Sequence, residues 1–336
     1  MKSVRVRRLA VAALAIFALP VLAACATGGG SDNSKGIRIA FLTFVASDYS
    51  SAEKRGIESV VKPAGGSVTL FSANFDPQQQ LSQCQDAITS KRFDAIVLSP
   101  VSSTTGVPCV KAAEAADIPV GTIETAVGKE PFQLKPQVKG VVAVVATTRK
   151  TILESTDKLV SLACGDANPC KVIAEIASAA DPYTNFVADG VAKDLGPRVQ
   201  IVQRFSTGYD PGEVAKQLPD ILSAHPDATV FMSAADSSAL AALPAVKDAG
   251  RTDTLKILGS GGSSDGAAAV ADGTIFATSG NWPQQSGAFL AKALTQAVHG
   301  EKVTHSELDG FKADNPQFVT KETVSEFKPE WGAAAK

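Results

Sequence analysis

Ten aromatic and polar side chains follow short apolar runs of the sequence and are the first candidates for chemistry. They are Phe44, Asp48, Tyr49, Glu124, Tyr183, Asn185, Tyr209, Asp236, Asn281 and Trp282. Aromatic rings offer flat faces to a small molecule, and carboxylates and amides hydrogen-bond its polar groups. Each of these residues alone could instead serve a turn or a helix cap, so the argument rests on their shared position after the apolar runs. The set predicts a pocket for a small, partly polar ligand.

A catalytic alternative lies in Gly-Ser-Ser-Asp-Gly at 262–266, which matches the serine-hydrolase pattern G-x-S-x-G. Asp272 followed by His299 would keep the chain order of a triad around Ser264, and His305 could replace His299. However, an elbow serine sits on a tight turn directly after its strand, whereas Ser264 lies in a glycine-rich loop. His299 precedes a glycine and suits a helix C-terminus. A hydrolase is therefore a remote alternative, and we expect no enzymatic activity, no cofactor and no metal.

The candidate side chains must be positioned by strands that alternate with helices. Strands are expected at 37–44, 67–73, 93–99, 119–124 and 140–146, and again at 171–177, 198–205, 227–233, 255–260 and 274–280. Several of these runs are continuously apolar, as in strands covered on both faces. Strand–helix alternation predicts doubly wound parallel sheets, in which ligands bind beyond the carboxyl ends of the strands. The ten candidates then lie at that edge.

Two segments of the chain carry nearly the same pattern, FDPQQQLSQCQDAI at 75–88 and YDPGEVAKQLPDIL at 209–222. Asp76 and Asp210 suit helix N-caps, each with proline at the first helical position. Gln79 and Glu213 stand where a capping box is completed. Any α/β protein can contain two capped helices, but the matching strands on both sides favour a duplicated βαβ unit. The sequence therefore predicts two similar lobes.

The first 24 residues predict a secretory signal, with the basic start MKSVRVRR, a short apolar run and small residues before Cys25. The tetrapeptide Leu-Ala-Ala-Cys at 22–25 resembles the lipobox of bacterial lipoproteins, whose cysteine carries a diacylglycerol and becomes the mature N-terminus. A signal peptide with a chance cysteine is the alternative. Residues 25–36 suit a flexible linker. We expect an exported chain that is tethered to the cell membrane at Cys25 and faces the extracytoplasmic side.

Charge and the remaining cysteines narrow the function classes. Removal of the basic signal segment makes the chain more acidic than its formal net charge of −2, which argues against nucleic acid and a polybasic membrane-binding face. Outside the cytoplasm, four cysteines suggest disulfides with three possible connectivities. Cys164 and Cys170 flank a short polar loop and are expected to pair, which leaves Cys84 with Cys109. A metal site is the weaker alternative.

Over nearly all of residues 37–320 the chain resembles the ribose/galactose-type (type I) periplasmic binding proteins, the solute receptors of ABC importers. The shared phrases are FDAIVLSP, AADIPV, the run at 224–250, and ATSGNWPQQSGAFLAKAL followed by HGEKV. The resemblance implies two Rossmann-like lobes, 37–143 with 282–312 and 144–281 with 313–330, joined by a three-strand hinge. It also implies a sugar-like ligand, an ABC transporter permease as partner and a monomer.

Some family positions carry over to this chain. Tyr49 matches an aromatic that stacks on the sugar ring, and Tyr209 matches a second one from the other lobe. Asp236 matches the aspartate of the family's Asn-Asp loop, and Asn281 stands where a glutamine is usual next to the hinge.

Other family positions are changed. Glu124 and Thr125 replace Asp-Arg, Asn185 lies in the stretch that supplies a sugar-binding arginine, and Ala235 replaces the asparagine before Asp236. Gly261 replaces the aspartate of a Gly-x-Asp turn. A site built to hydrogen-bond hydroxyls discriminates strongly, and many such groups are missing here. A less polar or smaller ligand is therefore open, as is a receptor subunit that presents a non-sugar molecule to a membrane sensor.

Overall fold

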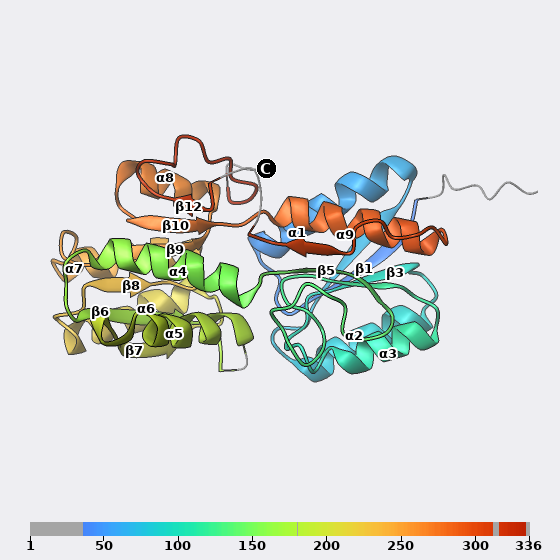
Figure 1. Cartoon of the computed structure of the whole chain (residues 1–336), viewed down its shortest axis with the longest axis horizontal. Coiled ribbons are helices and arrows are strands. Elements are labelled where there is room, and N and C mark those ends of the chain that lie inside the picture. The colour runs from blue at the N-terminus through green and yellow to red at the C-terminus, as the bar shows by residue number, and fades with distance from the viewer. Residues whose placement is uncertain (1–35, 180, 312–315, 334–336) are drawn as a thin grey trace, which may run out of the picture. The chain divides into compact units, whose positions relative to one another are not determined.

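The computed structural model describes residues 36–179, 181–311 and 316–333, which belong to one compact unit of the chain (Figure 1). The predicted signal segment, Cys25 and the linker up to residue 35 lie outside the described residues. Within the described part, no helix is both long and apolar enough to cross a membrane.

The first sheet has the strand order β11-β5-β4-β3-β1-β2, and all its pairs are parallel. Its strands are β1 (Arg38–Thr43), β2 (Ser67–Ser72), β3 (Ala95–Leu98), β4 (Val120–Thr122), β5 (Val141–Ala146) and β11 (Glu307–Asp309). Helices α1 (Asp48–Val61) and α9 (Pro283–Val298) cover one face, and α2 (Pro77–Thr89) and α3 (Val107–Ala115) cover the other (Figure 1). We call this sheet with its helices the first lobe.

The second sheet repeats this order as β12-β10-β9-β8-β6-β7. Its strands are β6 (Cys170–Ile176), β7 (Val199–Ser206), β8 (Val230–Met232), β9 (Lys256–Gly261), β10 (Ala277–Gly280) and β12 (Phe318–Val319). Only β12 pairs antiparallel, against β10. Helices α4 (Arg149–Cys164) and α5 (Pro182–Asp194) cover one face, and α6 (Pro211–Ala224), α7 (Asp236–Asp248) and α8 (Ser264–Asp272) cover the other. This is the second lobe.

The continuously apolar strands are buried on both faces. In β1, Ile39 and Phe41 pack with α1 and α9, whereas Ala40 and Leu42 pack against α2 and α3. All four side chains are fully buried, as the run of apolar residues predicts for a strand between two helical layers. All ten predicted strands are present; the sequence reasoning missed the very short β11 and β12.

The chain passes between the lobes three times: from β5 to α4, from β10 to α9, and from β11 to β12. The predicted division at 143/144 falls inside β5, whose residues up to Ala146 all lie in the first sheet. The first passage therefore comes after β5, since a strand cannot leave its sheet without losing its ladder hydrogen bonds.

The duplicated motif forms two matching strand–helix turns. Asp76 accepts hydrogen bonds from the backbone N–H groups of Gln78 and Gln79, and Asp210 accepts from Gly212 N–H. Both prolines occupy the first helical position, as predicted. The preceding aromatics, Phe75 and Tyr209, have left-handed backbones with φ of 62° and 61°, which is uncommon for such bulky residues.

Each copy of the motif has a glutamine seven residues after its aspartate, and the two glutamines make the same hydrogen bond. Gln83 donates to the Ser72 carbonyl at 2.8 Å, and Gln217 donates to the Ser206 carbonyl at 3.1 Å. Each of these hydrogen bonds ties a helix to the end of the strand before it. This is a structural reason why the aspartate and the glutamine have the same spacing in both copies.

The predicted capping boxes of these two helices are wrong. The Gln79 amide donates to the Ser72 carbonyl at 3.4 Å, and the Glu213 carboxylate accepts from Lys216. The N-cap N–H groups of Asp76 and Asp210 donate instead to backbone carbonyls, at 2.9 Å and 3.1 Å. A complete capping box forms instead at Ser47 and Ser50, at the start of α1.

Both predicted disulfides are confirmed. Cys84–Cys109 joins α2 to α3, and Cys164–Cys170 joins the end of α4 to the start of β6.

Candidate functional site

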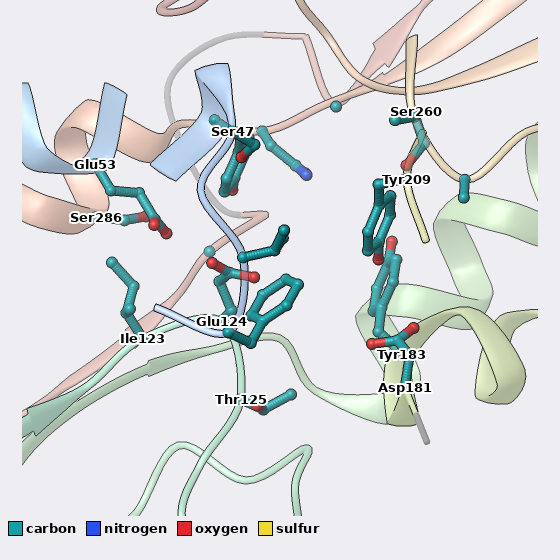
Figure 2. Close-up of a pocket in the computed structure, with 18 of the residues that line it drawn as sticks. Ser47, Glu53, Ile123, Glu124, Thr125, Asp181, Tyr183, Tyr209, Ser260 and Ser286 are labelled. Atoms are coloured by element: carbon teal, nitrogen blue, oxygen red, sulfur yellow. The ribbon is translucent and has the colours of Figure 1, made fainter. Parts of the chain in front are cut away.

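A cavity of about 400 Å³ lies between the two lobes, where both sheets present the carboxyl ends of their strands (Figure 2). Loops after β1, β3, β4 and β5 line it from the first lobe, and loops after β6, β7, β8, β9 and β10 line it from the second. This volume is in the range that encloses a small organic ligand. Seven of the ten predicted site residues line it: Phe44, Asp48, Tyr49, Glu124, Tyr183, Tyr209 and Asn281.

Asn185 does not line the cavity, contrary to the prediction. It lies in the first turn of α5, and its amide donates to the carbonyls of Ser178 and Asp181, both at 2.7 Å. Its donors are therefore used to close the β6–α5 loop. Trp282 does not line the cavity either, because its ring is buried in the core of the second lobe.

Asp236 is the third predicted site residue that does not line the cavity. Its carboxylate turns into the interior of the second lobe, where it accepts from Ser263 N–H and the Thr278 hydroxyl, both at 2.5 Å. Burial raises the pKa of Asp236 to about 6. It ties the start of α7 to β10 and to the turn before α8, while neighbouring Ala235 and Ser237 line the cavity.

The aromatic rings of the two repeated motifs meet between the lobes. Tyr209 lies nearly parallel to Phe75, with ring centroids 6.3 Å apart and an interplanar angle of 18°. Phe44 contacts both rings, at 5.3 Å from Phe75 and 6.2 Å from Tyr209. The two copies of the motif thus meet through their aromatic rings, and Tyr209 lines the cavity with Phe44.

Trp331, in the segment after β12, was missed by the sequence reasoning. Its indole N–H donates to the Gly261 carbonyl at 2.8 Å, and its ring packs edge-on against Tyr49 at 5.4 Å. A Cβ at residue 261 would lie 2.5 Å from this ring. The aspartate expected at residue 261 from the resemblance would therefore collide with Trp331. No pattern in the sequence around Trp331 indicates that this residue lines a cavity formed by distant segments.

Glu53 was also missed. It is fully buried on α1, one turn after Tyr49, and lines the cavity. Figure 2 shows its carboxyl group pointing into the cavity beside Ser286 of α9. The two helices approach closely at Gly56 and Gly287, where an added Cβ would lie 2.0 Å and 2.1 Å from backbone oxygens of the other helix. A glutamate four residues after a candidate tyrosine on a helix was the available signal.

Two neighbouring carboxyl groups dominate the electrostatics of the first-lobe side. Burial raises the pKa of Glu124 to about 8, although a hydrogen bond from the Ser99 hydroxyl at 3.1 Å opposes this shift. Burial, followed by the charge of Glu124, raises the pKa of Glu53 well above its usual range. The pair therefore retains a proton at neutral pH. Burial likewise raises the pKa of Asp181 on the opposite side.

Comparison with known proteins identifies the family. The chain matches the family described as "Periplasmic binding protein domain" over residues 39–302. It belongs to this family. The expected type I periplasmic binding protein fold is thereby confirmed.

Two curated members show how far the likeness extends. The ribose import binding protein of Bacillus subtilis is 26% identical over 253 residues, which cover 74% of this chain and 77% of that protein. The xylitol-binding protein of Mycolicibacterium smegmatis is 26% identical over 288 residues, with 84% and 78% covered.

Solved structures share the fold of this periplasmic binding protein. An ABC transporter solute-binding protein from Mycobacterium smegmatis with bound glycerol has a TM-score of 0.74 at 24% identity, covering 89% of this chain and 99% of that one. A solute-binding protein from Agrobacterium vitis with bound D-fucose has a TM-score of 0.74 at 23% identity, covering 86% and 97%.

The hydrolase alternative gains no support from the placement of its residues in this periplasmic binding protein. Ser264 begins α8 of the second lobe, whereas His299 caps the end of α9 over the first lobe, as its position before Gly300 predicted. Among the described residues that line the cavity there is no histidine. Solute binding, the function of the family, therefore fits the site better than acyl transfer.

Proposed function

We propose that this protein is an exported, lipid-anchored solute-binding protein that captures a sugar or sugar-like molecule and delivers it to the permease of an ABC importer. The observation that carries the proposal is the cavity, because its walls come from both lobes. A ligand that touches both walls favours the arrangement in which the lobes lie together, and a permease can recognise that arrangement.

The cavity offers complementary groups for such a ligand. Tyr49 and Tyr209 present aromatic faces from opposite lobes, suited to the apolar face of a sugar ring. Glu124 after β4 and Asn281 after β10 supply hydrogen-bonding groups, and Asp48 adds a carboxylate at the start of α1. The three connections between the lobes would serve as the hinge.

Ligand binding is tested by thermal unfolding of the purified protein against pentoses, hexoses, polyols, nucleosides and less polar metabolites. A ligand at a thousand times its Kd stabilises the folded state by about 4 kcal/mol, which raises the melting temperature measurably. A panel that leaves the melting temperature unchanged throughout would contradict the proposal.

Anchoring and transport need separate tests in cells. Cys25→Ser should move the protein from the membrane fraction to the soluble extracytoplasmic fraction, because the acceptor of the lipid is lost. A deletion strain should stop taking up the identified ligand. Uptake that persists while a ligand-induced response disappears would instead identify a subunit of a membrane sensor.

A further inference from the structure

The lining of the cavity, as far as the structure describes it, is acidic and includes no basic side chain. Four carboxyl groups line it, Asp48, Glu53 and Glu124 from the first lobe and Asp181 from the second, and its described lining residues include no lysine, arginine or histidine. Figure 2 shows Glu53 and Glu124 on one side of the cavity and Asp181 on the other. A bound molecule therefore meets negative or acidic groups on both walls.

Buried acceptors in this lining are short of hydrogen-bond donors among the described residues. The fully buried Glu53 carboxyl group has only the neighbouring Glu124 carboxyl group as a partner, through the proton that the pair retains, and Oδ1 of Asn281 is unpartnered. Buried acceptors without partners are costly. The Glu53 carboxyl oxygens and Oδ1 of Asn281 would each gain a partner from a ligand that donates hydrogen bonds.

One donor in the lining is already in use, since the indole N–H of Trp331 donates to the Gly261 carbonyl. The remaining side-chain donors are hydroxyl groups, the Asn281 amide and the proton that the carboxyl pair retains. The four carboxyl groups give the lining more acceptor capacity than donor capacity. A sugar hydroxyl both donates and accepts, whereas an ammonium group only donates. The lining matches the ammonium group better.

The aromatic rings add a second attraction for positive charge. Phe44, Tyr49, Tyr183, Tyr209 and Trp331 all line the cavity. The face of an aromatic ring attracts a cation, most strongly when the pair is shielded from solvent.

We infer that the ligand of this cavity carries a protonated amine, which lies against Glu53 and Glu124 while the rest of the molecule packs on the aromatic rings. This inference rests on the proposed solute-binding function and names its ligand class: a small amine-bearing polyol or sugar. The carboxyl pair would release its retained proton to solvent as the ammonium group takes its place, so that the buried negative charge is balanced by the ligand.

The test uses matched pairs of compounds that differ by an amine in place of a hydroxyl group: galactosamine with galactose, glucosamine with glucose, and 1,4-diaminobutane with 1,4-butanediol. Calorimetric titration of the purified protein should give at least tenfold tighter binding for an amine than for its hydroxyl partner in one or more pairs. Glu53→Gln and Glu124→Gln should each weaken amine binding by about 10- to 100-fold, the value of a hydrogen bond to a charged group.

Glu58→Gln is the control variant, because Glu58 lies on the same helix but pairs with Lys54 and Lys62 on the surface. It should bind the amine like the wild type. Each Gln variant is checked by circular dichroism, and if one fails to fold the other carries the same test.

The possible results separate this inference from the proposed function. If only the neutral members of the pairs bind, the inference is overturned and solute binding stands. If amines bind but both Gln variants keep full affinity, the amine lies elsewhere and the inference fails. If neither these pairs nor any compound of the wider panel binds, the proposed function fails and the inference with it.

Discussion

Glu124 should contribute strongly to the pH dependence of stability, because burial raises its pKa from 4.5 to about 8 in the folded protein. In the unfolded chain this carboxyl group loses its proton near pH 4.5. Between pH 4.5 and pH 8 the folded state binds one proton more than the unfolded state. The free energy of unfolding therefore keeps its full contribution from this group below pH 4.5 and loses it as the pH rises towards 8.

The magnitude follows from the shift. One pKa unit corresponds to about 1.36 kcal/mol, so the loss between pH 4.5 and pH 8 is on the order of 5 kcal/mol at most. This is an upper bound, since Glu124 keeps some exposure to the cavity. The titratable groups that face Glu124 are Glu53 and Tyr49 of α1, Asp181 at the start of α5, and Tyr209 after β7.

The assay is urea unfolding of wild type and Glu124→Gln at pH 5, 6, 7 and 8. Titrations of distant groups cancel in the difference between the two proteins. The wild type should lose several kcal/mol relative to the variant between pH 5 and pH 8. Glu58→Gln, a control on α1, should keep the slope of the wild type. Parallel curves for wild type and Glu124→Gln would refute the argument that the buried pair retains a proton.

Three further predictions concern binding and packing. Tyr209→Ala should abolish ligand binding and leave the circular dichroism spectrum of the free protein unchanged; an unaltered Kd in titration would put the binding site elsewhere. Gly287→Ala should lower the stability to urea by about 1–3 kcal/mol, because its Cβ would lie 2.1 Å from the Glu53 carbonyl, whereas Lys292→Ala on the exposed side of α9 should have little effect. Replacing Cys84 and Cys109 together by serine should cost about 3 kcal/mol in the same assay, since their bond closes a loop with a sequence separation of 25; a cost near zero would mean that the loop is already constrained without it.

Features of the fold that depend on neighbouring residues could be predicted from the sequence. The strands follow from apolar runs that are buried on both faces, and the helix starts at Asp76 and Asp210 follow from local hydrogen bonds to backbone N–H groups. The repeated pattern predicted two similar lobes, and parallel topology predicted which loops share an edge. These inferences succeed because propensity, capping and strand register act over a few residues.

The direction of individual side chains could not be predicted in this way. Asn185 and Asp236 follow strands as expected, yet hydrogen bonds to the β6–α5 loop and to β10, respectively, turn them away from the cavity. For Asp236 the deciding partner is Thr278, a residue 42 positions away. A polar side chain that finds hydrogen-bond partners inside the lobe turns towards them. The sequence around the side chain does not indicate whether the fold will supply those partners.

The composition of the cavity was decided by tertiary structure. Glu53 reaches the cavity because two glycines let α1 and α9 approach closely, and Trp331 reaches it because its indole N–H binds the Gly261 carbonyl, 70 residues earlier in the chain. The sequence by itself determined the strands, the helices and the strand edge where a ligand site must lie. Only the packing of distant segments decided which carboxyl groups are buried there together, because desolvation and the meeting of charges depend on where the chain folds back on itself.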